Sequence, residues 1–462
     1  METIYRSRYN YFVDRPDGVM AYNARTGTFA LLSRQIAEQL RSAAELPDFP
    51  DLVQLLEMGF LHAGDEKDRL ISFYRDGKQA DSGKLSLTIA PTLACNRKCG
   101  YCYQTEYRTG KIMSPQTQAA TISFVRSRVQ AGQTEVHCVW YGGEPLLAKT
   151  ILFDMCSRLK AGIEEEGGRL LPMMVVTNGV LLDAETARRL AESGVKSAQI
   201  SFDSMIDDGY EHRGLVTQDR KPSIILTNIL SAMDHLKLHI RVNVTRSNQS
   251  TLPEMLSILR DRGLGKLTYL ARVSNLEAET GAVTDRSGKR HRREDCNDAL
   301  FPLFQPSDDT LTRFDFSELE SSLMLNRTEA LNTISRKLTP RSRFCCATSE
   351  SQFVIAPDGE ISRCWDSAGS NSESIGSVHD RQSKIEESEV YRRWLAESPF
   401  SCVACTACKV LPLCMGGCPH TRLFMQPEKP LCEAIEQQIQ FCVELVGKRL
   451  SVPPVQNGCE ET

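Results

Sequence analysis

Long apolar runs are missing from this 462-residue sequence. No uninterrupted apolar stretch reaches the roughly 20 residues that a helix needs to span a bilayer. The first residues, METIYRSRYNYFVDRPDG, contain no apolar core of the signal-peptide type. An excess of one charge is missing too, because 55 Lys and Arg stand against 59 Asp and Glu, a net charge of −4. The sequence therefore indicates neither a membrane nor a nucleic-acid partner, and we expect the protein to be cytoplasmic.

Cysteine, by contrast, is plentiful, with 17 residues. In a reducing cytosol, clustered cysteines are more often metal ligands or catalytic thiols than disulfides. The clusters lie at 95–102 and 345–432. Five others stand alone and are interpreted as buried small side chains or inert thiols: Cys138, Cys156, Cys296, Cys442 and Cys459.

The first 80 or so residues predict a small winged-helix-like α+β module. RYNYFVD and VMAYNARTGTFALL read as strands, with turns at RPDG and NARTG. Residues 33–43 and 48–61 have the apolar spacing of amphipathic helices, and Ser33 is the expected N-cap of the first. The polar run 63–84 is interpreted as a linker.

After this linker, short apolar strands alternate with helical segments. The strands are expected at 84–91, 135–143, 171–179, 196–203, 239–245 and 266–273, and the helices at 114–132, 146–167, 183–194, 222–237 and 251–263. This alternation predicts an α/β fold whose parallel sheet curves into a partial (β/α)6 TIM-like barrel. Ligand sites in such folds lie at the carboxyl ends of the strands.

A first cysteine motif follows the first of these strands. Cys95, Cys99 and Cys102 form C-x3-C-x2-C. Zinc with a fourth ligand from elsewhere fits this spacing, and so does an iron–sulfur cluster with one iron left free. The spacing alone does not decide between them.

The loops after the next strands carry a resemblance. They read WYGGEP at Trp140–Pro145, TNG at Thr177–Gly179, SFD at Ser201–Asp203 and RVNV at Arg241–Val244. Together with the cysteine motif, and in this order, they resemble the radical S-adenosylmethionine (SAM) superfamily.

The resemblance implies a [4Fe-4S] cluster on Cys95, Cys99 and Cys102, whose free iron binds S-adenosyl-L-methionine. Reductive cleavage of this cofactor would give a 5′-deoxyadenosyl radical that abstracts hydrogen from the substrate. The cofactor-binding residues that it implies are Tyr101, Gly142, Gly143, Glu144, Asn178, Ser201, Asp203 and Asn243. Glu144 is expected near the methionyl amine, and the glycines are expected to let backbone approach the methionyl group.

The second cysteine cluster resembles the SPASM extension of peptide-modifying radical SAM enzymes. Its central spacing, C-x2-C-x5-C-x3-C, is formed by Cys405, Cys408, Cys414 and Cys418. Cys346, Gly359 and Cys364 precede this pattern, and Cys432 follows it. The resemblance implies two auxiliary [4Fe-4S] clusters, three with the first. One would use Cys405, Cys408, Cys414 and Cys432, and the other Cys346, Cys364 and Cys418. Its fourth position stays open: Cys345, Cys402, or a site for substrate or solvent. A zinc ribbon is the alternative.

The N-terminal module resembles the peptide-recognition element of enzymes that mature ribosomally made peptides. This implies that the module binds a leader peptide as an added strand. We therefore divide the chain into a leader-recognition module and linker (1–83), a radical SAM barrel (84–300), a helical bridging segment (301–344) and a SPASM domain (345–450).

The sequence thus predicts a radical SAM oxidoreductase that installs a modification, such as a thioether or carbon–carbon crosslink, in a precursor peptide. Its partners would be that peptide and an electron donor such as a flavodoxin or ferredoxin. An anaerobic sulfatase-maturating, formylglycine-forming enzyme is one alternative, although that family has an acidic residue where this chain has Trp365, with Asp366 one place later. A non-catalytic metal-bound electron-transfer or interaction protein is the other.

Overall fold

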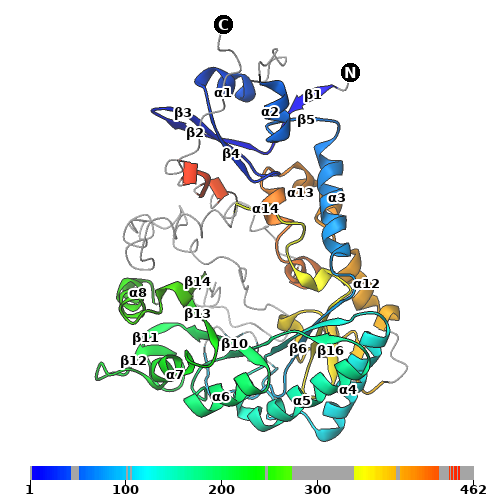
Figure 1. The fold of residues 1–462 in the computed structure, drawn as a ribbon, viewed down its shortest axis with the longest axis vertical. Helices are drawn as coiled ribbons and strands as arrows, with labels where there is room; N and C mark the ends of the chain where they lie inside the picture. The colour runs from blue at the N-terminus through cyan, green and yellow to red at the C-terminus, as the bar shows by residue number, and fades with distance from the viewer. Residues whose placement is uncertain are drawn as a thin grey trace.

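The structure is a computed structural model. It describes residues 3–42, 51–99, 107–244, 248–272, 338–380 and 385–425, with Cys102, Gln104 and a few positions between 436 and 447. Tyr101, Cys432 and most of the expected bridging segment 301–344 lie outside the described residues. Figure 1 shows the blue N-terminal module at one end and the barrel at the other.

The predicted parallel sheet is confirmed. Six strands pair in parallel with their neighbours and follow one another across the sheet in chain order. They are β6 (Lys84–Ile89), β7 (Glu135–Trp140), β9 (Met173–Thr177), β10 (Val195–Phe202), β13 (Lys237–Val244) and β14 (Thr268–Arg272). A two-residue strand, β8 (Arg169–Leu170), pairs with β7. All six strands run the same way, so their carboxyl ends and the loops that follow lie at one edge.

Five helices connect the strands, as predicted. They are α4 (Pro115–Gln130), α5 (Lys149–Glu165), α6 (Ala184–Glu192), α7 (Ile224–Ala232) and α8 (Leu252–Asp261). Three begin at capping side chains that accept a backbone N–H three residues on, namely Ser114, Asp183 and Ser223. Figure 1 shows α4, α5 and α6 packed along one face of the sheet.

The cysteine-rich region extends the barrel sheet, which the sequence did not predict. β15 (Gln352–Ile355) pairs in parallel with β6, and β16 (Glu360–Ser362) and β17 (Gly376–Ser377) continue antiparallel. The sheet thus reads β14-β13-β10-β9-β7-β6-β15-β16-β17. Residues more than 260 positions apart become neighbours, with Gln352 opposite Ser86.

The N-terminal module matches its predicted α+β composition. β2 (Asn10–Arg15), β3 (Gly18–Asn23) and β4 (Thr28–Leu32) form an antiparallel sheet, and β1 (Ile4–Arg6) pairs with β5 (Leu61–Ala63). Two helices accompany them, α1 (Arg34–Arg41) and α2 (Leu52–Glu57). The second is shorter than the helix expected over 48–61, because Gly59 has a positive φ and Leu61 begins β5. The expected N-cap is confirmed, because the Ser33 hydroxyl accepts the Ile36 N–H.

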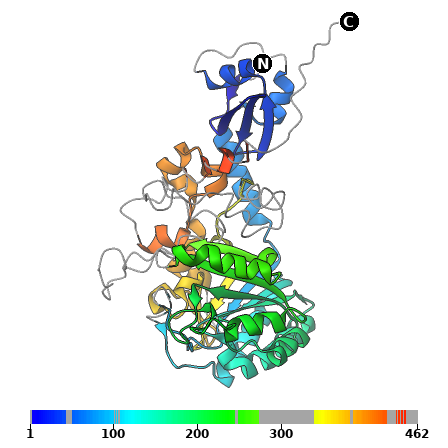
Figure 2. The same ribbon diagram turned by 90° about the vertical axis from the view of Figure 1, so that its left-hand side faces the viewer.

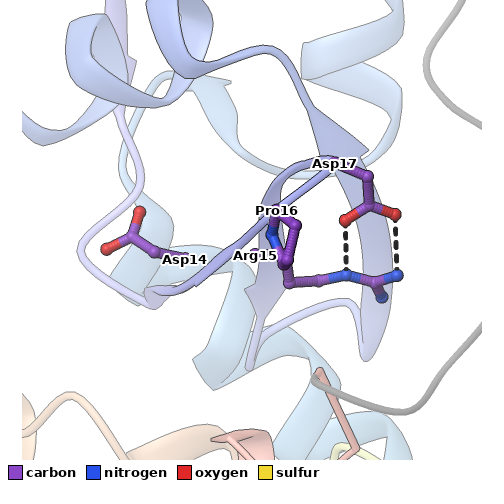
Figure 3. A pocket seen from close by; sticks show the side chains of 4 residues that line it. All are labelled: Asp14, Arg15, Pro16 and Asp17. Atoms are coloured by element: carbon purple, nitrogen blue, oxygen red, sulfur yellow. Dashed lines mark hydrogen bonds and ion pairs between the residues drawn. The ribbon is translucent and has the colours of Figure 1, made fainter.

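A hollow of about 530 Å³ lies at the turn between β2 and β3. Figure 3 shows its lining residues Asp14, Arg15, Pro16 and Asp17, with the Arg15 guanidinium donating twice to the Asp17 carboxylate at 2.8 Å. Arg15 also donates to the carbonyl of Gly447 at 3.0 Å. The turn predicted at RPDG is thus present, with Arg15 and Asp17 paired across it.

The polar run interpreted as a linker is a helix, which corrects the sequence analysis. α3 spans Glu66–Gln79, and its N-cap Asp65 accepts the Lys67 N–H. Leu70 and Tyr74 are buried one turn apart, so a narrow apolar stripe was hidden within a charged sequence. Figures 1 and 2 show α3 running from the N-terminal module along the cysteine-rich region.

Short helical elements complete the fold. The cysteine-rich region contains α12 (Glu389–Ala396), α13 (Val403–Ala407) and α14 (Leu411–Cys414). One-turn 3-10 segments lie at Pro145–Ala148, Gln249–Thr251, Gly265–Leu267, Cys346–Thr348, Trp365–Ser367, Asn371–Glu373, Ile385–Glu387 and Pro399–Ser401, and a π turn at Thr421–Met425. Among the helices that the structure describes, none combines the length and apolar character needed to cross a membrane.

Candidate functional site

The cysteine loop follows β6 and is held by the glycines of the GGEP sequence. A Cβ atom on Gly142 would lie 2.3 Å from the carbonyl oxygen of Thr92, and one on Gly143 would lie 2.3 Å from that of Ala94. The Gly143 N–H donates to Thr92 and the Glu144 N–H to Ala94, at 3.2 and 2.8 Å. The absence of a Cβ therefore lets the two loops pack backbone to backbone. A close approach of these glycines to a cofactor stays a prediction.

The three thiols of this loop lie close enough to interact electrostatically. Burial raises the pKa of Cys99 to about 11, and the negative charges of Cys102 and Cys95 add to this effect. Burial also raises the pKa of Cys95. Buried thiols with raised pKa values are poor free nucleophiles but can become thiolates as metal ligands, because the metal replaces the proton.

Glu144 lies at the centre of the strand-end loops and is completely buried. One carboxylate oxygen accepts the Leu146 N–H at 3.0 Å and the Thr177 hydroxyl at 2.8 Å. The other accepts the Asn178 N–H at 2.7 Å. Burial raises the pKa of Glu144 to about 7, and these donors counteract the shift in part. In this structure Glu144 joins the GGEP and TNG loops, and its expected position near the cofactor amine stays a prediction.

Asn178 continues this connection to the cysteine loop. Its side-chain amide donates to the Asn96 side-chain oxygen at 2.7 Å and lies 3.8 Å from the Cys95 sulfur. Its own amide oxygen accepts the Val180 N–H at 3.0 Å. The TNG loop therefore contacts the first cysteine motif directly, as the order of motifs suggested.

The SFD and RVNV strand ends also meet. Ser201 in β10 lies opposite Arg241 in β13. The side-chain amide of Asn248 donates to the carbonyls of Asp203 and Asn243, both at 2.7 Å. The Asp203 carboxylate accepts the backbone N–H and the Nε of Arg213 at 2.7 Å, and the Asn243 side chain accepts the Nε of Arg241 at 2.8 Å. Among the described residues, Ser201, Asp203 and Asn243 thus lie together, and their contact with a cofactor stays a prediction.

Three arginines surround the cysteine loop, and the sequence analysis missed them. Arg97 lies within the motif itself, whereas Arg108 and Arg213 come from flanking segments. The Arg108 side chain hydrogen-bonds Cys102, and its Nη1 donates to the Arg97 carbonyl at 2.8 Å. The Arg213 charge acts on Cys99 and Cys95. Cations beside three cysteines suit ligands that bind as thiolates. The sequence CNRKC was an available signal for Arg97, but nothing local pointed to Arg108 or Arg213.

The cysteine-rich region brings a second group together. Cys345, Cys346 and Cys364 interact electrostatically, and a hydrogen bond between the two adjacent sulfurs lowers the pKa of Cys346. Next to Cys364, the Trp365 ring packs at a tilt against Tyr141 with centroids 4.5 Å apart, and its Nε1 donates to the Thr88 hydroxyl at 2.8 Å. This group is therefore fastened to the carboxyl end of the barrel strands.

Cysteines between positions 402 and 414 form a third group. Cys402, Cys405 and Cys414 interact electrostatically, near the Arg422 guanidinium. Cys408 lies on the side facing the N-terminal module. There its charge adds to the effect of burial in raising the pKa of Tyr9 and Tyr11. These contacts place Cys402 with the third group and Cys345 with the second. Of the two candidates for the open position, Cys345 therefore fits the Cys346 and Cys364 group better.

The sequence CMGGC forms a left-handed turn between Cys414 and Cys418. Met415, Gly416 and Gly417 all have positive φ, at 45°, 82° and 70°. Glycine adopts this conformation at little cost, so the paired glycines permit a tight left-handed turn. Cys418 lies half-buried after this turn, and its expected cluster stays a prediction.

The donors that the first cysteine loop offers are cysteine thiols, the usual ligands of iron–sulfur clusters. Cubane clusters are wider than one ion and are held by cysteine thiolates. Cys95, Cys99 and Cys102 would hold such a cluster, with the Asn178 loop and Arg108 beside it.

A separate cavity of about 940 Å³ lies at the opposite, amino-terminal ends of β6, β7 and β15. Charged side chains from α3, the turn after it, α4 and the loop before β15 line it: Arg75, Lys78, Asp81, Arg128 and Glu350. The predicted site lies at the other, carboxyl-terminal ends of the strands, so this cavity is separate from it.

Comparison with known proteins identifies the central part of the chain. Residues 89–248 match the Radical SAM superfamily. The chain is 30% identical over 178 residues to a probable GTP 3′,8-cyclase of Methanopyrus kandleri, covering 38% of this chain and 53% of that protein. It is 24% identical over 188 residues to the PqqA peptide cyclase of Gluconobacter oxydans, covering 40% of this chain and 49% of that protein. The chain thus spans about half the length of the curated relatives it matches.

A solved structure shares the fold over a larger part of the chain. It is described as native anSMEcpe with bound AdoMet and Kp18Cys peptide, and it superposes with a TM-score of 0.55 at 18% identity. The match covers 79% of this chain and 98% of that one. The radical SAM superfamily implies a [4Fe-4S] cluster and SAM, in agreement with the cysteine loop. This chain therefore contains a radical SAM superfamily domain, built by residues 89–248.

Proposed function

We propose that the protein is a radical SAM peptide maturase that modifies a ribosomally made precursor peptide. The observation that carries this proposal is the docking of the N-terminal module on the cysteine-rich region. The Tyr74 hydroxyl of α3 donates to the Glu397 carbonyl at 3.0 Å, and its ring packs edge-on against Phe400. Lys78 donates to the Leu395 carbonyl at 3.0 Å. A recognition module held against the cysteine-rich region suits a substrate that is bound at one part of its chain and modified at another.

The N-terminal sheet adds contacts to the third cysteine group. Arg8 donates to the Thr406 carbonyl at 3.1 Å, and the Lys409 amine lies 3.9 Å from the centre of the Tyr11 ring. The two contacted residues, Thr406 and Lys409, lie on either side of Cys408 in the sequence. We propose that the module binds a leader peptide as an added strand, because main-chain hydrogen bonds give such binding affinity with little demand on sequence.

The proposed chemistry begins at the first cysteine loop. When bound there, the cluster and SAM supply a 5′-deoxyadenosyl radical for hydrogen abstraction. Cys95, Cys99 and Cys102 hold the cluster, while the Glu144 and Asn178 contacts hold the neighbouring loops in place. The second and third cysteine groups are proposed to hold two auxiliary [4Fe-4S] clusters, and a flavodoxin or ferredoxin would supply electrons. The matched peptide cyclase and the peptide-bound structure of the same fold are consistent with a peptide substrate.

The proposal is tested with reduced, reconstituted enzyme and a short peptide encoded beside it. We expect release of 5′-deoxyadenosine and a peptide whose mass shows loss of hydrogen, as a crosslink requires. Iron analysis should give about 12 Fe per chain for three cubanes. No 5′-deoxyadenosine with any such peptide would contradict the proposal. Formation of an aldehyde in a sulfatase-derived peptide would instead support the sulfatase-maturating alternative, in which Trp365 would have to be compatible with that reaction.

A further inference from the structure

A buried ion pair joins the first cysteine loop to an excursion of the barrel. Arg97 lies between Cys95 and Cys99, and its two terminal nitrogens donate to the two carboxylate oxygens of Asp207 at 3.0 and 3.1 Å. The side chains are 3% and 7% exposed. Arg97 also donates to the His212 carbonyl at 3.2 Å.

Asp207 belongs to an excursion that follows β10, residues 203–216. Its strands β11 (Ser204–Ile206) and β12 (Gly214–Val216) pair with each other and lie outside the main sheet. A second contact ties it to the cysteine loop, because the Lys98 N–H donates to the Tyr210 carbonyl at 2.9 Å. The excursion therefore contacts two successive residues within the cysteine motif.

The other charged side chains around this contact have partners of their own. Arg213 pairs with Asp203 at 2.7 Å, and Arg108 hydrogen-bonds Cys102. The neighbouring Asp208 carboxylate instead accepts from the exposed His212 ring at 2.7 Å and shapes the turn itself. Among the described acidic residues of the excursion, Asp207 thus neutralises the guanidinium that lies inside the cysteine motif.

Burying both charges is costly, so the pair by itself is weak evidence for added stability, and its two-point geometry points to a role in fixing one arrangement of the loop. A bidentate guanidinium–carboxylate contact also restricts direction as well as distance. We propose that the excursion is a clamp on the iron–sulfur loop, and that Asp207 is a positioning residue that acts through Arg97. It holds Cys95 and Cys99 in the spacing that the first cluster requires. The inference rests on the radical SAM domain and is independent of the substrate.

The test compares wild-type holoenzyme with Asp207→Asn, Asp207→Glu and Asp208→Asn. The readouts are the anaerobic rate of iron transfer to a chelator and the change that SAM causes in the electron paramagnetic resonance spectrum of the reduced cluster. We expect Asp207→Asn to lose iron at least about tenfold faster, because the Arg97 charge is left buried without its partner. It should also weaken the spectral change. Asp207→Glu should restore most of both properties, and Asp208→Asn should behave like the wild type.

Alkylation of the full-length chain without iron gives a second, cluster-independent readout. Asp207→Asn should raise the modification rate of Cys95 and Cys99 relative to Cys405 and Cys408, measured by peptide mass spectrometry. Equal acceleration at all four thiols would show a general loss of structure and overturn the positioning role. Equal iron release from Asp207→Asn and Asp208→Asn would overturn the clamp. Neither outcome bears on the peptide assay, so failure here and failure of the proposed function are distinguishable.

Discussion

The carboxylate of Glu144 accepts the backbone N–H of Asn178 at 2.7 Å, entirely within the protein interior. This contact joins the GGEP loop after β7 to the TNG loop after β9, and the Asn178 side chain then reaches the cysteine loop. Two motifs that are 33 residues apart in the sequence thus act as one structural unit beside the first cysteines.

Stability should depend on pH through Glu144. Its pKa rises from 4.5 to about 7 on burial, so the folded protein keeps a proton that the unfolded chain loses between these values. The free energy of unfolding therefore decreases as the pH rises from about 4.5 to about 7. The decrease is about 1.4 kcal/mol for each unit by which the pKa differs between the folded and unfolded states. In chemical unfolding curves at pH 5 and 7.5, Glu144→Gln should show a smaller decrease than the wild type. The exposed Glu164→Gln variant is the control, and equal pH slopes in all three would contradict the prediction.

Cys99→Ala should abolish cofactor cleavage while leaving the other two cysteine groups intact. Removing one of three thiolates leaves the first cluster without a stable ligand set. The measurements are 5′-deoxyadenosine release and iron content, with Cys138→Ala as the control because that cysteine is buried in β7 outside the three groups. Cleavage that persists in Cys99→Ala would mean that the first motif has been misread.

Arg108→Gln should lower the midpoint potential of the first cluster. Its guanidinium hydrogen-bonds Cys102 and also acts on Cys95 and Cys99, so it stabilises the more negative, reduced state. A redox titration followed by electron paramagnetic resonance measures the shift. Arg188→Gln, on the exposed surface of α6, supplies a charge-matched control. An unchanged or higher potential in Arg108→Gln would show that this charge does not act on the cluster.

The two candidate ligands in the cysteine-rich region should behave differently. Cys345 interacts with Cys346 and Cys364, whereas Cys402 interacts with Cys405. We therefore expect Cys345→Ser to reduce the iron bound by the second group, and Cys402→Ser to leave it unchanged. Iron content and Mössbauer spectra of the two variants, in a background without the first cluster, make the comparison. The reverse order would assign the open position to Cys402.

Tyr74→Phe should loosen the N-terminal module without disturbing the barrel. The variant loses the hydrogen bond to the Glu397 carbonyl, worth about 1 kcal/mol, but keeps the packing against Phe400. Tyr74→Ala loses both and should cost about 3–5 kcal/mol, as for other buried aromatic truncations. Hydrogen exchange along α3 measures the effect, with the partly exposed Phe73→Leu as control. Equal exchange rates in Tyr74→Ala and Phe73→Leu would show that α3 does not dock the N-terminal module.

The sequence by itself determined the periodic parts of the fold. Six apolar strands and five amphipathic helices alternate clearly enough to predict the parallel barrel, and Ser33 was identifiable as a helix cap. The cysteine spacings and strand-end motifs were also local, so they indicated the superfamily before any contact was known. Helix α3 was missed because Leu70 and Tyr74 form a narrow stripe within a charged segment, and its burial comes from a distant region.

Only the tertiary structure decided which residues meet. Parallel pairing of β15 with β6 joins segments far apart in the chain, and no local pattern encodes such a register. The same holds for Arg97 with Asp207, 110 residues apart, and for Glu144 with Asn178, because one ion pair or hydrogen bond leaves no periodic trace in the sequence. Residue types and their spacing were enough to predict radical SAM chemistry, whereas the sheet topology determined which loops hold the cysteines in place.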